Sequence, residues 1–157
     1  MFSLFIRNLF FTILQPGLVA GLIPFWITGF RINNIFVKVW QLHHYIGTIV
    51  FLIGFVIMIW CIISFAVKGR GTLSPIDPTK RLVVAGLYKF SRNPMYVGVT
   101  LILIGESAYF QSVELWIYAL FVFITFNIFA ILIEEPRLRK DFGEDYKRYC
   151  EKVRRWI

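Results

Sequence analysis

Two short segments of the chain combine charged side chains with proline in patterns that could bind a ligand. The first, GLYKFSRNPMYVG, covers residues 86–98. Pro94 suits the first position of a helix, and Asn93 suits the cap before it. Free N–H groups at that helix start, beside Arg92, could hold a carboxylate. A capped helix with an arginine at the membrane interface explains the same residues without a ligand.

The second segment, EEPRLRKDFGEDYKRYC, covers residues 134–150 and begins with two adjacent carboxylates. Glu134 and Glu135 follow an apolar stretch and are predicted to terminate its helix, where acidic groups oppose the helix dipole. One explanation is that Glu135, before Pro136, helps start the next helix. The other is that a partly buried glutamate accepts hydrogen bonds from an ammonium group or from ribose hydroxyls.

The composition places these segments in a membrane protein. Hydrophobic residues make up 58% of the 157 residues, aromatic residues make up 18%, and the mean hydropathy is +0.69. A soluble core would leave much of this apolar surface exposed, whereas a bilayer can cover it. The net charge of +8 lies between and after the apolar stretches, which indicates membrane topology and argues against a nucleic-acid partner.

The hydropathy pattern predicts an all-α fold, a polytopic membrane helix bundle forming a single domain over residues 1–157. Charge-free stretches of this length can cross a hydrocarbon core of about 30 Å. The predicted spanning helices cover residues 8–30, 45–67, 94–110 and 115–133. Pro16 and Pro24 predict kinks in the first of them, where glycines would offer small surfaces to neighbouring helices. Residues 68–92 are predicted to form a cytoplasmic loop.

A further helix is predicted over residues 136–153, where apolar residues recur at helical spacing. They are Leu138, Phe142, Tyr146, Tyr149 and Val153. This amphipathic helix would lie on the cytoplasmic membrane surface or fold back over the mouth of the bundle. Gly143 within it costs about 1 kcal/mol relative to alanine, so the helix depends on its contacts.

Basic residues before the third predicted helix and after the fourth indicate that both regions face the cytoplasm. Both termini are then predicted to be cytoplasmic, and the multi-pass chain places His43 and His44 on the opposite side, as interfacial residues. The two cysteines, Cys61 and Cys150, lack the spacing of a zinc site and are interpreted as packing residues. We expect no metal.

Taken together, the two polar segments resemble the superfamily of isoprenylcysteine carboxyl methyltransferases and phospholipid methyltransferases. Its members carry an R-[HN]-P-x-Y element and a later series of E-E-P-x-L, F-G-x-x-Y, Y and R-W. The matching residues are Arg92, Asn93, Pro94 and Tyr96, then Glu134, Glu135, Pro136, Leu138, Phe142, Gly143, Tyr146, Tyr149, Arg155 and Trp156. The resemblance covers residues 69–156. Many members have histidine where this chain has Asn93, which makes an imidazole base at that position unavailable here.

The resemblance implies a membrane methyltransferase that uses S-adenosylmethionine and releases S-adenosylhomocysteine. The implied cofactor-binding residues are Gly69, Gly71, Gly86, Tyr88, Asn93, Pro94, Met95, Tyr96, Glu134, Glu135, Leu138 and Tyr146. Arg92 or Arg155 would act at the catalytic site by orienting an acidic substrate group. The Gly69 and Gly71 turn is equally explained as a helix C-cap.

The expected acceptor is a hydrophobic, lipid-like molecule from the bilayer, foremost an isoprenylcysteine-type carboxylate, with a phospholipid amine or a small thiol as alternatives. A different class of function is also open, namely a non-catalytic membrane subunit or a small transporter. In that case Glu106, a costly carboxylate inside the third helix, would pack helices or line a path together with Asn127. We predict a hydrogen bond between these two side chains.

Overall fold

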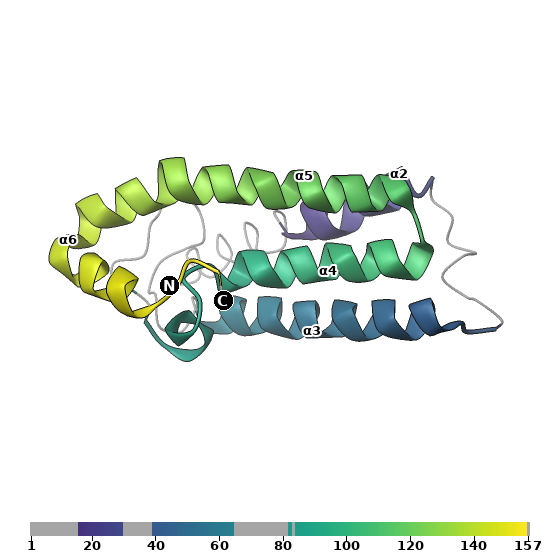
Figure 1. Cartoon of the computed structure of the whole chain (residues 1–157), viewed down its shortest axis with the longest axis horizontal. Helices are drawn as coiled ribbons and strands as arrows, with labels where there is room; N and C mark the ends of the chain where they lie inside the picture. Colours follow the sequence, from purple (N-terminus) through teal and green to yellow (C-terminus); the bar gives the residue numbers. More distant parts are fainter. Residues whose placement is uncertain (1–15, 30–38, 65–81, 83, 157) are drawn as a thin grey trace, which may run out of the picture.

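The computed structural model describes residues 16–29, 39–64, 82 and 84–156, and within these ranges all regular elements are helical, with no strand. Three long helices lie side by side, α3 (Leu42–Ser64), α4 (Pro94–Phe110) and α5 (Val113–Phe129), with α4 in the middle (Figure 1). After α5 the chain bends back toward the start of α4. The predicted all-helical class is confirmed for the described part of the chain.

Two pairs of glycines allow α3 and α4 to approach closely. A Cβ atom built at Gly47 would lie 2.8 Å from the carbonyl oxygen of Gly105, and one built at Gly54 would lie 2.6 Å from that of Gly98. Any side chain at these positions would therefore push the helices apart. Residue numbers rise along α3 as they fall along α4, so the two helices are antiparallel. Small residues at such crossings are typical of helices that pack within membranes.

A short turn of Gln111 and Ser112 joins α4 to α5. Gln111 adopts a left-handed conformation with φ of 51°, and the Ser112 side-chain oxygen accepts a hydrogen bond from the Leu115 N–H at 3.3 Å. This cap starts α5 at Val113, slightly before the predicted start at residue 115. The predicted antiparallel hairpin is present.

The two adjacent carboxylates do not terminate the fourth helix, so that prediction is wrong. α5 continues through a π-helical turn, η5 (Ala130–Glu134), into α6 (Glu135–Lys152), and Glu134 has helical φ and ψ of −75° and −50°. The carboxylates therefore lie inside a continuous helical path, away from any helix C-terminus, and the dipole argument against them does not apply. π-turns of this kind occur frequently at functional sites.

Gly143 bends α6 sharply. Its φ of 50° and ψ of −123° lie outside the helical region, in a conformation that residues with a Cβ rarely adopt. The prediction of one uninterrupted helix over residues 136–153 is therefore wrong at this glycine. The predicted apolar face nevertheless comes together, because Tyr146, Tyr149 and Val153 form one buried cluster against Leu138 and Phe142.

The first predicted helix, over residues 8–30, is described only from residue 16. It forms a π-helical turn, η1 (Leu18–Leu22), followed by α2 (Ile23–Ile27) with Pro24 in its first turn. The π-turn directly before Pro24 agrees with the predicted irregularity. The expected close helix packing at its glycines is not seen, since no described atom lies within 4 Å of a Cβ built at Gly17 or Gly21.

Two of the described helices are long and apolar enough to cross a membrane, Leu42–Ser64 and the apolar part of Val113–Lys152. Large apolar side chains face outward along α3 and α5, as lipid contact would favour. They include Ile49, Leu52 and Val56 on α3 and Ile117, Phe121 and Ile124 on α5. α4 has 17 residues, which span about 25 Å. Four crossings and cytoplasmic termini remain predictions.

Candidate functional site

Tyr96 and Glu134 join the two polar segments singled out in the sequence. Tyr96 lies in the first turn of α4, and its hydroxyl donates a hydrogen bond to Glu134 Oε2 at 2.9 Å. Its ring stacks on Phe126 of α5, with 4.5 Å between the ring centroids. Glu134 lies about two helical turns beyond Phe126. The start of α4 and the first carboxylate therefore share one end of the bundle.

Glu135, the second carboxylate, binds two arginines from different parts of the chain. Arg155 donates from Nε to Oε1 at 2.7 Å and from Nη2 to Oε2 at 3.1 Å. Arg92 Nη1 lies 3.3 Å from Oε1. Burial raises the pKa of the Glu135 carboxyl, but the Arg155 hydrogen bond and the Arg92 charge outweigh it and hold the pKa below its ordinary value. Both oxygens of Glu135 are therefore already occupied within the protein.

Arg92 has one buried polar atom left over. Its Nη1 also donates to the Cys150 sulfur at 2.9 Å, but its Nε is buried without a hydrogen-bond partner in the part of the chain that the structure describes. A buried guanidinium donor without an acceptor is costly. An anionic or carbonyl ligand beside Arg92 would satisfy it.

The last described residues pack against the segment that precedes α4. The Arg92 N–H donates to the Arg154 carbonyl at 2.9 Å, and the side chains of Ser91 and Asn93 each donate to the Arg155 carbonyl at 3.3 Å. Asn93 holds the N-cap position as predicted, but its side chain makes no cap hydrogen bond. It binds the C-terminal segment instead, because the Arg155 carbonyl lies within reach.

Tyrosines fix the segment between residues 84 and 93 from both sides. The Tyr149 hydroxyl donates to the Tyr88 carbonyl at 2.6 Å, and burial raises the pKa of Tyr149 to about 12. Tyr88 lies in the short helix η4 (Gly86–Lys89), which begins at a positive φ of 64° at Gly86. The Tyr88 side chain is buried and packs with Cys61 and Met95. The backbone around Arg92 is therefore held in place before any ligand binds.

Trp156 and Asn127 form a link that the sequence did not predict. The Trp156 indole N–H donates to Asn127 Oδ1 at 3.1 Å, and the Asn127 amide donates to the Phe123 carbonyl of its own helix at 2.9 Å. The predicted hydrogen bond between Glu106 and Asn127 is therefore wrong, since the C-terminal tryptophan occupies Asn127. Ser91 was also missed. Its signal is its position next to the Arg-Asn-Pro element.

The remaining predicted site residues are placed less directly. Pro94 is at the start of α4 as expected, while Leu138 and the buried Tyr146 belong to the apolar cluster around Val153. Gly69 and Gly71 lie outside the described residues.

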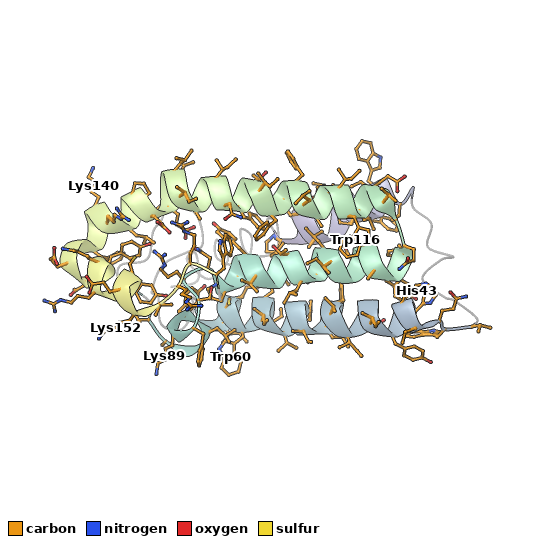
Figure 2. All side chains as sticks on the ribbon, viewed as in Figure 1. His43, Trp60, Lys89, Trp116, Lys140 and Lys152 are labelled. Carbon is orange, nitrogen blue, oxygen red and sulfur yellow. The ribbon has the colours of Figure 1, made fainter. Side chains whose placement is uncertain are left out.

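Basic side chains gather at the site end of the bundle, where Lys89, Lys140 and Lys152 are seen (Figure 2). His43 lies at the opposite end, as does Trp116. Within the described ranges, no group of three or more histidine, cysteine or acidic residues could hold a metal ion.

An apolar helix bundle that carries a cluster of carboxylates, arginines and tyrosines at one end is the architecture of a membrane protein with a polar site at the bilayer edge. The chain belongs to the phospholipid methyltransferase family, which it matches over residues 42–145. This membership confirms the superfamily resemblance and indicates a membrane-bound methyltransferase that acts on lipid.

Individual relatives agree with this family. An uncharacterized protein of Haemophilus influenzae is 35% identical over 63 residues, which are 40% of this chain and 100% of that protein. Phosphatidylethanolamine N-methyltransferase B of Dictyostelium discoideum is 28% identical over 106 residues, 66% of this chain and 52% of the relative. The chain thus spans about half the length of the Dictyostelium protein. No solved structure matches it.

Proposed function

We propose that this protein transfers a methyl group from S-adenosylmethionine to the amine of a phospholipid, at the end of the bundle where Tyr96 meets Glu134. The observation that carries the proposal is the 2.9 Å hydrogen bond between these two residues. It brings together two segments of a chain that belongs to the phospholipid methyltransferase family. Neither segment alone offers both an acidic and a basic group to one ligand.

The polar groups at this end fit the chemistry of the cofactor. An amino-acid moiety with ribose hydroxyls needs a carboxylate acceptor for its ammonium and hydroxyls, and a cationic donor for its own carboxylate. Glu134 is the carboxylate that no arginine pairs with among the printed ion pairs of the described residues, and Arg92 offers its unpartnered Nε. Tyr88 and Tyr96 add aromatic rings that favour a cationic sulfonium nearby.

This division of labour refines the roles implied by the resemblance. Glu134 and Tyr96 would contact the cofactor, whereas Glu135 would act as a positioning residue, because it is committed to Arg92 and Arg155. Arg155 would likewise hold Glu135 and the C-terminal segment in place. Arg92 retains a donor for a ligand.

When bound, S-adenosylmethionine supplies an activated methyl group on a sulfonium, so the transfer is an in-line displacement that requires little acid–base assistance. The amine nitrogen forms the new bond to the methyl carbon, the carbon–sulfur bond breaks, and a proton leaves the nitrogen. The protein's task is to align the two partners and to exclude water. The segment of residues 153–156, packed on residues 91–93, would close the site from the aqueous side.

The acceptor inferred here is the phospholipid amine, in place of the isoprenylcysteine carboxylate that the sequence favoured. The family and the named Dictyostelium relative support the amine. The fully apolar outer surfaces of α3 and α5 support a substrate that arrives from the bilayer.

Methyl transfer to defined acceptors tests this proposal. Purified protein in dodecyl maltoside would be given methyl-labelled S-adenosylmethionine with phosphatidylethanolamine, farnesylcysteine or dodecanethiol. We expect label in the methylated phospholipid, and Tyr96→Phe should lower the rate by about tenfold, as expected for loss of one hydrogen bond to a charged group. Tyr45→Phe, an exposed tyrosine at the opposite end, should leave the rate unchanged. Label in farnesylcysteine alone, or equal rates for both variants, would overturn the proposal.

A further inference from the structure

A separate cavity lies at the other end of the bundle, between α2, α3 and α4. Its volume is about 330 Å³, and its lining includes Phe25, Thr48, Phe51, Glu106 and Tyr109. Glu106 follows Tyr96 by ten residues on α4, which places it about 15 Å further along the helix axis. This cavity is therefore distinct from the site at Tyr96 and Glu134.

Glu106 brings a carboxylate oxygen to this cavity without a protein partner. Its Oε2 atom is buried and makes no hydrogen bond within the described part of the chain. Nearby hydroxyls serve other acceptors: Tyr118 donates to the Val19 carbonyl at 2.9 Å, and Thr28 donates to the Phe25 carbonyl at 2.9 Å. A buried carboxylate oxygen without a partner costs free energy that a donor or cation would recover.

The rest of the lining specifies what kind of partner fits. Aromatic rings surround the space, from Phe25, Phe51, Tyr109 and Phe110, and Glu106 is the one residue with a formal charge among the described lining residues. Aromatic faces attract cations, most strongly cations that carry alkyl groups and little water. The cavity is at the small end of the range of ligand pockets, which runs from about 300 to 1,000 Å³. It can hold a headgroup-sized ligand and is too small for a whole lipid.

We propose that this cavity is a second binding site, beyond the proposed methyl-transfer site, and that it takes a small hydrophobic ammonium ion through the Glu106 carboxylate and the surrounding aromatic rings. The ammonium could belong to a free alkylamine or to a lipid headgroup, since the recognising chemistry is the same. Its place between α2, α3 and α4 means that an occupant would tie the first helix to the α3–α4 pair.

Calorimetric titration of the purified protein in dodecyl maltoside with tetraethylammonium chloride tests the site directly. We expect saturable binding that Glu106→Gln weakens by about tenfold or more, because the isosteric amide removes the charge. Glu114→Gln, which neutralises an exposed carboxylate at the tip of the α4–α5 hairpin, should bind as the parent protein does. The neutral probe N,N-diethylacetamide should bind far more weakly than the cation.

A second variant protects the test against a folding defect in Glu106→Gln. Thr48→Leu fills the cavity without changing any charge, and it should also weaken tetraethylammonium binding. Competition by added phosphatidylcholine would identify a lipid headgroup as the occupant, whereas phosphatidylglycerol should not compete in either case. Absence of saturable tetraethylammonium binding, or affinities that neither Glu106→Gln nor Thr48→Leu changes, would overturn the proposal.

Discussion

At the scale of single residues, Glu135 is the point where three segments meet. Its carboxylate is buried, with 8% of the side chain exposed, and it binds Arg92 from the segment before α4 and Arg155 from the C-terminal end. Replacing it leaves two arginines with unsatisfied donors and no nearby counter-charge. The residue therefore links cofactor-site geometry to the stability of the fold.

We expect Glu135→Gln to lower the free energy of unfolding by about 2 kcal/mol, the scale of hydrogen bonds to a charged group. Denaturation of the purified protein in mixed detergent micelles would measure it. Glu144→Gln is the matched control, because Glu144 forms an exposed pair with Lys147 at 3.7 Å and should change stability by less than about 0.5 kcal/mol. Equal effects of the two variants would contradict the role given to Glu135.

The same carboxylate makes stability depend on pH. The folded protein holds the pKa of Glu135 below its ordinary 4.5, because the hydrogen bond from Arg155 and the charge of Arg92 together outweigh burial. Its stabilising contribution is complete above the unfolded pKa and is lost as the pH falls through the lower, folded pKa. Melting temperatures measured from pH 7 down to about pH 3 should therefore drop more for the parent than for Glu135→Gln. Parallel curves would argue against this assignment.

Much of the site could be predicted from residue types, but its internal pairing could not. Arg92, Tyr96, Glu134 and Glu135 carry the chemistry that their charges suggested. Which carboxylate is committed to arginine depends on the π-turn over residues 130–134, which turns Glu134 and Glu135 toward different partners. No local signal in the sequence specifies that extra residue in the turn.

At the scale of helices, the crossing of α3 and α4 depends on glycine. We expect Gly54→Ala to destabilise the protein by about 1–3 kcal/mol through overpacking, because its Cβ would meet the Gly98 carbonyl oxygen at 2.6 Å. Gly17→Ala is the control, since no described atom lies within 4 Å of its Cβ and alanine favours a helix by about 1 kcal/mol. Thermal denaturation in detergent would compare them, and a neutral Gly54→Ala would show that the helices are further apart than described.

Hydropathy located the long helices because a charge-free run of this length has few alternatives to a spanning helix. It failed where geometry depends on contacts between distant residues. The pairing of Gly47 with Gly105 requires the antiparallel register of α3 and α4, and the bend at Gly143 depends on the docking of the chain after it onto the start of α4. Asn127 was paired with the wrong side chain because its true partner, Trp156, lies at the far end of the chain.

At the scale of the whole molecule, the two ends of the bundle should face opposite sides of the membrane. The basic end holds Lys140, and the α4–α5 turn lies at the other end (Figure 2). We expect an added cysteine at Lys140 to react with an impermeant maleimide only in inside-out vesicles, and one at Glu114 only in right-side-out vesicles. The parent chain, with its native Cys61 and Cys150, gives the background labelling. Labelling of both cysteines from one side would refute the topology.

The central claim is that the start of α4 and Glu134 form one cofactor site, and titration of the purified protein with S-adenosylmethionine tests it most directly. We expect saturable binding, an affinity at least about tenfold lower for Glu134→Gln, and an unchanged affinity for the exposed Glu144→Gln. The same affinity for Glu134→Gln as for the parent protein would contradict the claim.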